Sequence, residues 1–552
     1  MGLLAVVSLV LLISYLPRGR TSPIELGSNE DPGPGKRGAV ATENSICSQH
    51  GIDILTMGGN AADALVASQL CVGVTGMYHS GIGGGGFMVV RSPDGEYEFI
   101  DFRETAPAAA YQDMFKNNTN AAVYGGLASG VPGEIRGLEY LHKKYGILPW
   151  STVVMPAVRT AREGFPVSED LVRYSEAAVS SRGEDFLAND PNWALDFAPN
   201  GTRLGLGDII TRKRYADTLE TIAKQGPDAF YSGAIADTMI NAIQKANGTM
   251  VVEDLTNYTV AIRNTSQITY RGQTVTSTTT PSSGSVALSI LSILNTYDDF
   301  FTSEQTLNLS THRFDEAIRF AYGQETQALY QISDQHTLNV SAYDPSGLES
   351  LETPGTSHLA VADHTGLAVS SITTVNLLFG SQVLVPETGI IMNNEMDVLI
   401  LHLNFSIPGV SNSFGFIPSE ANFIRPGKRP MSSITPVIVT RPDGQLALVA
   451  GSAGGSRIIT ATVASIIHVI DQGLDAAEAL AKPRLHDQLV PDQTTFEYAY
   501  DNSTVAFMKS RGHNVTWVAP GQSSAQLIRV SPNGTFDAAG EPRQLTSAGY
   551  SI

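Results

Sequence analysis

The chain has 552 residues, of which 42% are apolar and 16% charged, a composition typical of a globular protein with a large core or two ordinary domains. Acidic residues outnumber basic ones by 54 to 35, and they are spread along the chain rather than gathered in a tail. The net charge of −19 and the lack of a basic stripe in the sequence argue against nucleic acid as a partner.

The first 20 residues predict a segment that directs export. Residues 3–16 form an uncharged, mostly apolar run of 14, followed by Arg18 and Arg20. A membrane-spanning helix needs about 20 apolar residues, so this run fits the core of a signal peptide, with a retained N-terminal anchor as the alternative. We therefore expect a protein of the secretory pathway, either secreted or membrane-anchored with its domain outside the cytosol.

Sequons and cysteines are consistent with export. The two cysteines, Cys47 and Cys71, favour a disulfide in an exported chain, and two buried thiols remain the alternative. Two cysteines and eleven scattered histidines offer no metal-ligand spacing, so we expect no metal site. The eleven Asn-x-Ser/Thr sequons begin at Asn117, Asn200, Asn247, Asn257, Asn264, Asn308, Asn339, Asn404, Asn502, Asn514 and Asn533.

The globular part is expected to begin near residue 39. Residues 21–38 are polar and rich in glycine and proline, which predicts a flexible lead-in. Residues 61–76 are small and apolar all round, which predicts a buried helix. Two short strands, 87–91 and 97–103, are predicted on either side of a Ser-Pro-Asp-Gly turn.

The middle of the chain, from about 130 to 330, reads as polar and largely helical. Apolar residues recur at helical spacing in 215–224 and 234–245. Residues 340–355 then predict an exposed loop.

The remainder of the chain has β character. Strands 359–362 and 368–373 predict one hairpin, and strands 437–440 and 446–449 predict a second. An apolar helix follows at 457–471. Hairpins from both halves of the chain, each next to an apolar helix, indicate sheets covered by helices.

Two glycine-rich stretches invite comparison with phosphate-binding loops. The first, GIGGGG at 81–86, has a helix before it and a strand after it, the reverse of a dinucleotide site, so it favours a close backbone approach instead. The second, GSAGGS at 451–456, lies between a strand and a helix. It fits either a nest of N–H groups for an anion or a tight turn.

Thr356 follows the predicted loop and begins a strand. A threonine hydroxyl is a weak nucleophile, but breakage of the preceding bond would create an α-amine with a pKa near 8 that could take its proton. Local pattern alone favours an ordinary threonine at a strand edge. Likewise, Ser432 and Ser433 follow a basic stretch and could bind a carboxylate, although paired serines are common in loops.

From about residue 39 to 550 the chain resembles the γ-glutamyltransferases (glutathione hydrolases), a family of N-terminal-nucleophile enzymes. Ten motifs in the same order carry the resemblance. They lie at 51–55, 58–64, 83–87, 101–104, 131–137, 226–231, 355–358, 393–397, 427–433 and 451–456.

The resemblance implies roles for individual residues. Thr356 would become the new N-terminus and nucleophile, supported by the hydroxyl of Thr374, and Gly454 and Gly455 would supply oxyanion-hole N–H groups. The spacing of Cys47 and Cys71 is also similar to a disulfide of animal members. The implied substrate ligands are Arg103, Ser432 and Ser433 for the α-carboxylate, Glu395 for the α-ammonium, and Asn376 for the glutamyl group.

The chain departs from the family pattern at two places. The family usually reads Met-Asp-Asp-Phe, with the second aspartate on the substrate ammonium. Here an apolar insertion, VLILHL at 398–403, separates Asp397 from Asn404, which stands in place of that aspartate. Asparagine keeps a hydrogen bond but loses the charge, which favours acyl groups without an α-amine, unless the insertion brings Asp397 into the pocket. We expect the Asn404 sequon to be unmodified. The stretch 325–355 is also shorter than in the family.

The resemblance implies a four-layer αββα sandwich, an α+β fold built jointly by a large segment (39–355) and a small one (356–552). It implies self-cleavage before Thr356 and transfer of the γ-glutamyl group of glutathione or related compounds to water, amino acids or peptides, without a cofactor. One alternative is an amidase of the same fold with altered acyl preference, similar to a cephalosporin acylase. The other is a non-catalytic homologue acting as a binding protein.

Overall fold

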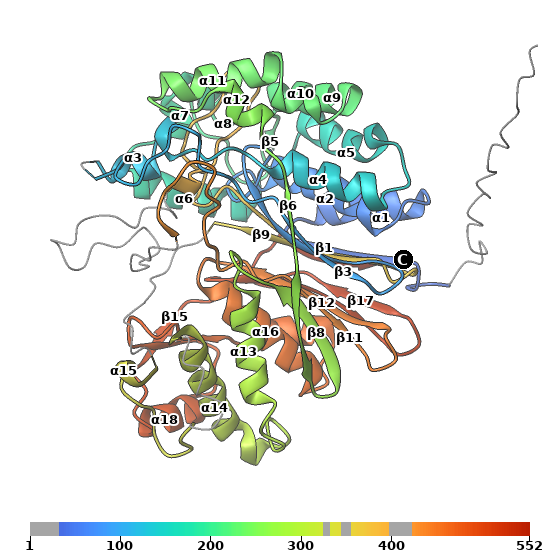
Figure 1. Cartoon of the computed structure of the whole chain (residues 1–552), viewed down its shortest axis with the longest axis vertical. Coiled ribbons are helices and arrows are strands. Elements are labelled where there is room, and N and C mark those ends of the chain that lie inside the picture. The colour runs from blue at the N-terminus through green and yellow to red at the C-terminus, as the bar shows by residue number, and fades with distance from the viewer. Residues whose placement is uncertain (1–32, 117, 324–331, 344–354, 397–421) are drawn as a thin grey trace, which may run out of the picture.

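Two antiparallel sheets lie face to face, and helices cover the outer face of each (Figure 1). The computed structural model describes residues 33–116, 118–323, 332–343, 355–396 and 422–552. Its four layers are those of the predicted αββα sandwich. Within the described residues, we find no helix with the length and apolar character needed to cross a bilayer.

The first sheet mixes strands from both sides of Thr356. The hairpin predicted after that residue is present, with β9 and β10 paired antiparallel, and β10 in turn pairs with β2. In spatial order the strands are β18 (Ala548–Ser551), β1 (Gly38–Thr42), β9 (Ser357–Asp363), β10 (Ala368–Thr374), β2 (Gly85–Arg91), β3 (Tyr97–Asp101) and β6 (Ala261–Arg263).

The second sheet also combines strands from both sides of Thr356. Its predicted hairpin, β11 and β12, is present and pairs through β11 with β8. In spatial order the strands are β17 (Phe536–Ala539), β16 (Ser524–Val530), β12 (Leu446–Ala453), β11 (Val437–Thr440), β8 (Gln273–Thr278) and β7 (Thr265–Tyr270). Two small sheets lie outside the sandwich: β13 (Leu485–His486), β14 (Thr494–Glu497) and β15 (Val515–Val518); and β4 (Phe165–Pro166) with β5 (Ile209–Ile210).

Alternation along the strands distributes side chains between three apolar layers. On β9, Val361 belongs to the core beneath the first helical layer, whereas Ala360 and Ala362 face the space between the sheets. That central layer is rich in small side chains, including Ala39 and Ala41, which lets the two sheets approach closely. A separate core lies between the second sheet and its helices.

The helices divide into two outer layers (Figure 1). The layer on the first sheet comes from the first half of the chain: α1 (Ser45–Thr56), α2 (Ala61–Thr75), α3 (Asn120–Val123), η1 (Gly126–Ala128), α4 (Glu134–Tyr145), α5 (Trp150–Glu163), α6 (Glu169–Arg182), α7 (Phe186–Asn189), α8 (Pro191–Phe197), α9 (Lys213–Gln225), α10 (Asp228–Tyr231), α11 (Ala234–Lys245) and α12 (Val252–Thr256). The layer on the second sheet comprises α13 (Gly284–Leu294), α14 (Glu304–Gly323), α15 (Val340–Tyr343), α16 (Arg457–Ile470), α17 (Ala476–Ala481) and α18 (Asn502–Ser510).

Helix α2 confirms the prediction of a buried helix, since every residue in it is buried. Asn60 caps its first turn, and Asp63 completes a capping box by accepting from the Asn60 N–H. Cys71 on this helix is disulfide-bonded to Cys47 on α1. The disulfide favoured by the sequence is therefore present.

The glycines at 81–86 serve close backbone packing, as their position between a helix and a strand predicted. A Cβ on Gly84 would lie 2.1 Å from the carbonyl oxygen of Thr374, and one on Gly86 would lie 2.0 Å from that of Ile372. Both oxygens belong to β10. Only glycine lets β2 pair with β10 at this distance, which places the end of β10 beside Thr356.

Candidate active site

Seven of the residues implied by the family resemblance line one pocket at the ends of the central strands. Gly355, Met431 and Ile458 complete its lining. The predicted residues that line it are Arg103, Thr356, Thr374, Asn376, Ser432, Ser433 and Gly455.

Thr356 lies immediately before β9 and is buried. Its hydroxyl donates to the carbonyl oxygen of Gly355 at 2.5 Å, and the Thr374 hydroxyl donates to the same oxygen at 2.7 Å. Thr374 in turn accepts from the backbone N–H of Asn376 at 2.8 Å. The Gly355 carbonyl is thus polarised by a second hydroxyl while the Thr356 hydroxyl is held against it.

Gly355 has a backbone conformation that only glycine tolerates. Its φ is +154°, and a Cβ there would lie 1.9 Å from the carbonyl oxygen of Asn376. Asn376 itself has a φ of +76°, which is unusual for a residue with a side chain. Its side-chain nitrogen, Nδ2, donates to the Asn394 carbonyl at 3.0 Å. The bond before Thr356 therefore lies in a tightly constrained stretch of backbone.

Gly454 and Gly455 form the junction between β12 and α16. Their φ values are +127° and +59°, so consecutive N–H groups can converge at the start of the helix as they do in anion-binding nests. Gly455 lines the pocket with Arg103, whereas Gly454 lines a smaller neighbouring pocket that also contains Gly355, Thr356 and His79. Each glycine thus lines a pocket together with Gly355 and Thr356, which favours the nest over a simple turn.

Arg103 brings a buried positive charge to the pocket wall. One guanidinium nitrogen (Nη1) lies 2.6 Å from the Glu395 carboxylate, and both side chains are almost fully buried. The Nε of Arg103 has no hydrogen-bond acceptor among the described residues, which leaves it available to an anionic group. A cation and an anion side by side suit the two charges of an α-amino acid head group.

Arg429 holds the backbone of Arg103, a role that sequence reasoning missed. Its guanidinium donates to the Arg103 carbonyl at 2.7 Å and to Asp101 at 3.1 Å. The Tyr258 hydroxyl donates to the same carbonyl at 2.8 Å. Arg429 belongs to the basic stretch before Ser432, so the motif signalled importance, but only the fold shows that this arginine supports another.

Glu104 lies beneath this ion pair. It is fully buried, and neither of its carboxylate oxygens has a hydrogen-bond partner among the described residues. Burial, together with the nearby charge of Glu395, raises the pKa of Glu104 well above its usual value. Arg103 Nη1 also lies 3.9 Å from the Glu104 carboxylate, so two buried carboxyl groups flank the guanidinium.

His358, two residues after Thr356, does not line the pocket. Its ring packs against Gly451 of the second sheet, where a Cβ would lie 2.4 Å from the ring, and its Nε2 is 3.0 Å from the Ser370 hydroxyl. Burial lowers the pKa of His358 to about 3, so the ring is neutral at physiological pH. It joins the sheets and is not placed to act as the base.

Two predicted ligands cannot be placed. Asp397, Asn404 and the 398–403 insertion lie outside the described residues, as does most of the short stretch 325–355. Of the residues predicted to bind an α-ammonium group, only Glu395 belongs to the described residues.

Comparison with known proteins agrees with this geometry. The model of the Gamma-glutamyltranspeptidase family matches residues 47–341 and 325–551. The glutathione hydrolase proenzyme of Arthroderma benhamiae is 57% identical, covering 94% of this chain and 93% of its own, and the glutathione hydrolase of Aspergillus flavus is 53% identical, covering 98% and 93%.

Among solved structures, the cephalosporin acylase from Bacillus halodurans aligns with a TM-score of 0.78 and 27% identity, covering 98% of this chain and 99% of its own. The αββα layers, the arrangement around Thr356 and the match along nearly the whole sequence lead to one conclusion. The chain belongs to the γ-glutamyltranspeptidase family.

Proposed function

We propose that this protein is a γ-glutamyltransferase that hydrolyses glutathione and related γ-glutamyl compounds or transfers their γ-glutamyl group to amino acids or peptides. The observation that carries the proposal is the pocket itself. Thr356, Gly455 of the glycine nest and Arg103 line one small space, and Glu395 pairs with Arg103 behind its wall. Relatives named glutathione hydrolases at 53–57% identity support the same substrate class.

Activation would begin with cleavage of the Gly355–Thr356 bond. The Thr356 hydroxyl oxygen attacks the Gly355 carbonyl carbon, which the Thr374 hydroxyl polarises. The acyl group moves from the Thr356 nitrogen to its oxygen and forms an ester. Water then hydrolyses the ester, leaving a Gly355 carboxylate and Thr356 with a free hydroxyl and a free α-amine.

The processed enzyme would use the same threonine on its substrate. The α-amine of Thr356 accepts the hydroxyl proton as the oxygen attacks the γ-amide carbon. The N–H groups of Gly454 and Gly455 stabilise the tetrahedral oxyanion, and the amine product leaves with a proton. Water or the amine of an acceptor then releases the γ-glutamyl group from Thr356.

Substrate recognition would depend on charge. Arg103, Ser432 and Ser433 would bind the α-carboxylate, Asn376 would contact the glutamyl group, and Glu395 would bind the α-ammonium. Asp397 or Asn404 is proposed to complete the ammonium site.

A second candidate is an amidase with altered acyl preference. Asn404 in place of the family's second aspartate removes a negative charge, and the fold aligns over nearly its full length with a cephalosporin acylase. Acyl groups such as glutaryl, which lack the α-ammonium, would tolerate this loss.

Steady-state kinetics on γ-glutamyl-p-nitroanilide and glutaryl-p-nitroanilide separate the two candidates. The proposed function predicts a higher kcat/KM for the γ-glutamyl substrate, because Glu395 has no ammonium partner in the glutaryl one. A higher kcat/KM for glutaryl-p-nitroanilide would favour the acylase. A chain that stays uncut and cleaves neither substrate would indicate a non-catalytic binding protein.

We also propose that the protein is exported, either secreted or anchored by residues 1–20. The disulfide between Cys47 and Cys71 supports an oxidising compartment. Nine sequons fall in the described residues, and at eight of them the asparagine is exposed; these are Asn200, Asn247, Asn257, Asn264, Asn339, Asn502, Asn514 and Asn533. A shift in gel mobility after glycosidase treatment of the protein from its native source would test export.

A further inference from the structure

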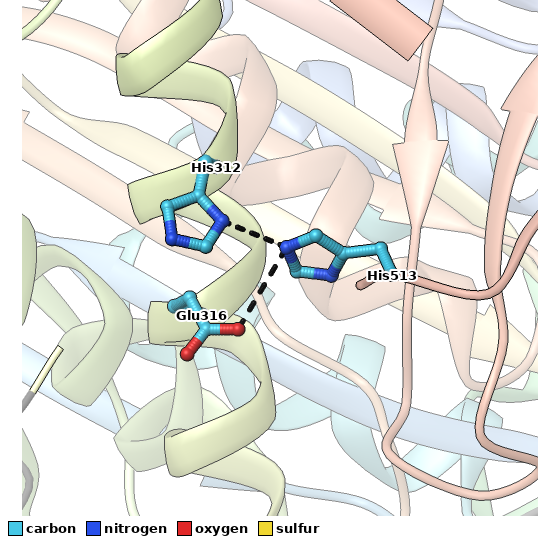
Figure 2. A group of neighbouring side chains, drawn as sticks. All are labelled: His312, Glu316 and His513. Carbon is cyan, nitrogen blue, oxygen red and sulfur yellow. Dashed lines mark hydrogen bonds and ion pairs between the residues drawn. The ribbon is translucent and has the colours of Figure 1, made fainter. Parts of the chain in front are cut away.

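A buried cluster of histidines and carboxylates lies in the helical layer over the second sheet (Figure 2). His312 and Glu316 project from consecutive turns of α14, and His513 comes from the segment between α18 and β15. All three side chains are buried, and none lines the pocket around Thr356.

The three side chains point at one another. The Nε2 of His513 lies 2.7 Å from the Nδ1 of His312 and 3.8 Å from the Oε1 of Glu316 (Figure 2). One potential ligand atom from each residue falls within 4.8 Å of the others. A helical pair four residues apart plus a distant third residue is an arrangement that zinc sites use.

The outer nitrogen of each ring, the one turned away from the other histidine, lies close to an oxygen atom. The Nε2 of His312 is 2.7 Å from the Ser333 carbonyl oxygen, within hydrogen-bond geometry, whereas the Nδ1 of His513 lies 2.8 Å from the Asp315 carboxylate as an ion pair without hydrogen-bond geometry. A nitrogen lone pair would repel either oxygen at these distances, so in each neutral ring the hydrogen belongs on the outer nitrogen, which leaves lone pairs on the two inner nitrogens. Lone pairs facing each other at 2.7 Å repel, so this contact needs either a proton or a metal ion between the two nitrogens. Carbonyl and carboxylate partners of this kind orient histidines that ligate metals.

The hydrogen bonding of Glu316 favours a metal ion over a proton shared by the two rings. Its Oε2 accepts from the Tyr343 hydroxyl at 2.7 Å, but its Oε1 has no hydrogen-bond partner among the described residues. A buried carboxylate oxygen without a partner is costly. A proton shared by the two rings would leave that oxygen with only the 3.8 Å ion pair to His513 and no hydrogen bond, whereas a metal ion would bind it together with both nitrogens.

The surrounding charges leave room for a divalent cation. Arg313 forms ion pairs with Asp299 and Asp334, and Arg319 with Asp487 and Asp492. Asp315 and Glu316 therefore have no arginine ion pair of their own among the described residues. Two buried carboxylates next to two rings can balance the charge of one such ion.

We propose that His312, Glu316 and His513 bind one divalent transition-metal ion, with Zn²⁺ the best match to two imidazoles and a carboxylate. Zinc–nitrogen bonds of about 2.0–2.1 Å in a tetrahedral site put the two nitrogens about 3.3 Å apart. The rings would have to separate by about 0.6 Å from their present 2.7 Å, a small side-chain adjustment. A water molecule would complete the four ligands.

The ion would join the two segments that the proposed cleavage creates. His312 and Glu316 precede Thr356, and His513 follows it, so the metal would link the large segment to the small one. This role rests on the proposed function. Metal binding does not, because all three ligands are also present in an uncut chain.

The test uses the full-length protein freed of metal and then given Zn²⁺ or Co²⁺ alone. We expect one Zn²⁺ per chain after removal of excess metal, a rise in Tm of about 3 °C or more, and a visible absorption band with Co²⁺ typical of tetrahedral coordination. The uncut Thr356→Ala chain should behave in the same way. If it binds the metal while the wild type remains one chain, the cleavage proposal fails and the metal site stands.

Matched variants locate the site. Glu316→Gln and His513→Gln should lose the bound metal and the rise in Tm, whereas His364→Gln, an exposed histidine on the β9–β10 turn, should keep both. Wild-type protein that retains no stoichiometric Zn²⁺ and shows no Co²⁺ band would overturn the proposal and indicate a shared proton. Equal binding by all three variants would also overturn it. The Co²⁺ band of the wild type requires no variant to fold.

Discussion

At the scale of single residues, the charged groups beside the pocket are buried, and other side chains fix their positions. Arg103 contacts Glu395 at 2.6 Å, and its carbonyl is clamped by Arg429 and Tyr258. This support leaves the guanidinium little freedom, so its fork is directed before any substrate arrives. Replacing the guanidinium of Arg103 by a group of another shape should therefore lower kcat/KM more than the same replacement at a surface arginine.

Arg103→Lys tests this directly. Lysine keeps the charge but loses the bidentate geometry, which costs about 1.5–3 kcal/mol per charge-assisted hydrogen bond, or roughly a 10- to 150-fold fall in kcat/KM. The substrate is γ-glutamyl-p-nitroanilide, and Arg162→Lys on the surface is the control. An unchanged kcat/KM for Arg103→Lys would mean that this arginine does not bind the substrate.

Glu134 offers a pH-dependent test of the network behind β10. Its two carboxylate oxygens lie 2.7 Å from Gln69 and 3.0 Å from the Thr373 hydroxyl. Burial raises the pKa of Glu134 from 4.5 to about 8. The folded protein therefore holds a proton between these values that the unfolded chain releases, and stability falls as pH rises from about 4.5 to 8.

Glu134→Gln replaces the protonated acid with a neutral group of the same shape. Relative to this variant, the parent should lose stability at roughly 1 kcal/mol per pH unit between pH 5 and pH 8. Unfolding temperatures in the uncut Thr356→Ala background, measured at several pH values, provide the comparison. Parallel pH profiles for the two chains would show that Glu134 is ionised in the folded state.

Sequence reasoning reached the residues that face the pocket but not those that support them. Thr356, Arg103 and Gly455 stand in recognisable motifs, so their roles could be proposed before the fold was known. The contacts of Arg429 and His358 join residues that are distant in sequence, which local pattern cannot reveal. His312 and His513 are 201 positions apart in the sequence. Because ligand spacing was judged from local sequence, the expectation of no metal site did not take this pair into account.

At the scale of elements, the strand β9 links the candidate nucleophile to the contact between the sheets. Thr356 precedes this strand, and His358 within it packs on Gly451 of β12. The same β12 ends at the Gly454–Gly455 junction. Close contact between β9 and β12 therefore sets the position of the glycine nest relative to Thr356.

Gly451→Ala should disturb both stability and activity. The new methyl group would lie 2.4 Å from the His358 ring, and overpacking of this kind costs about 1–3 kcal/mol. We expect a lower Tm and slower cleavage, with Tm partly restored in the double variant that adds His358→Ala. The control is Gly444→Ala, in the open β11–β12 turn, where the cost is one of backbone conformation alone. Equal Tm values for Gly451→Ala and the wild type would show that the sheets are not tightly packed there.

Element types were easier to predict than their order. The turns and alternating residues of the two hairpins are local signals, and both hairpins were found with small shifts at their ends. Strand order depends on pairings between distant segments, such as β1 with β18 and β2 with β10. No local periodicity encodes these, so the αββα sandwich could be expected only from the family resemblance.

At the scale of the whole molecule, both sheets are built from strands on the two sides of Thr356. β9 and β10 lie between β1 and β2 in the first sheet, and β8 pairs with β11 in the second. Cleavage before Thr356 would therefore leave two chains that remain one folded body. The cut would change the chemistry of the pocket without separating its walls.

The most direct test of the proposed activity is N-terminal sequencing of the purified protein after denaturing electrophoresis. We predict two fragments, the smaller beginning Thr-Ser-His-Leu at Thr356, and a single inactive chain for Thr356→Ala. A smaller fragment that begins at another residue, or a wild-type enzyme that is fully active while uncut, would contradict the proposal that Thr356 is an N-terminal nucleophile.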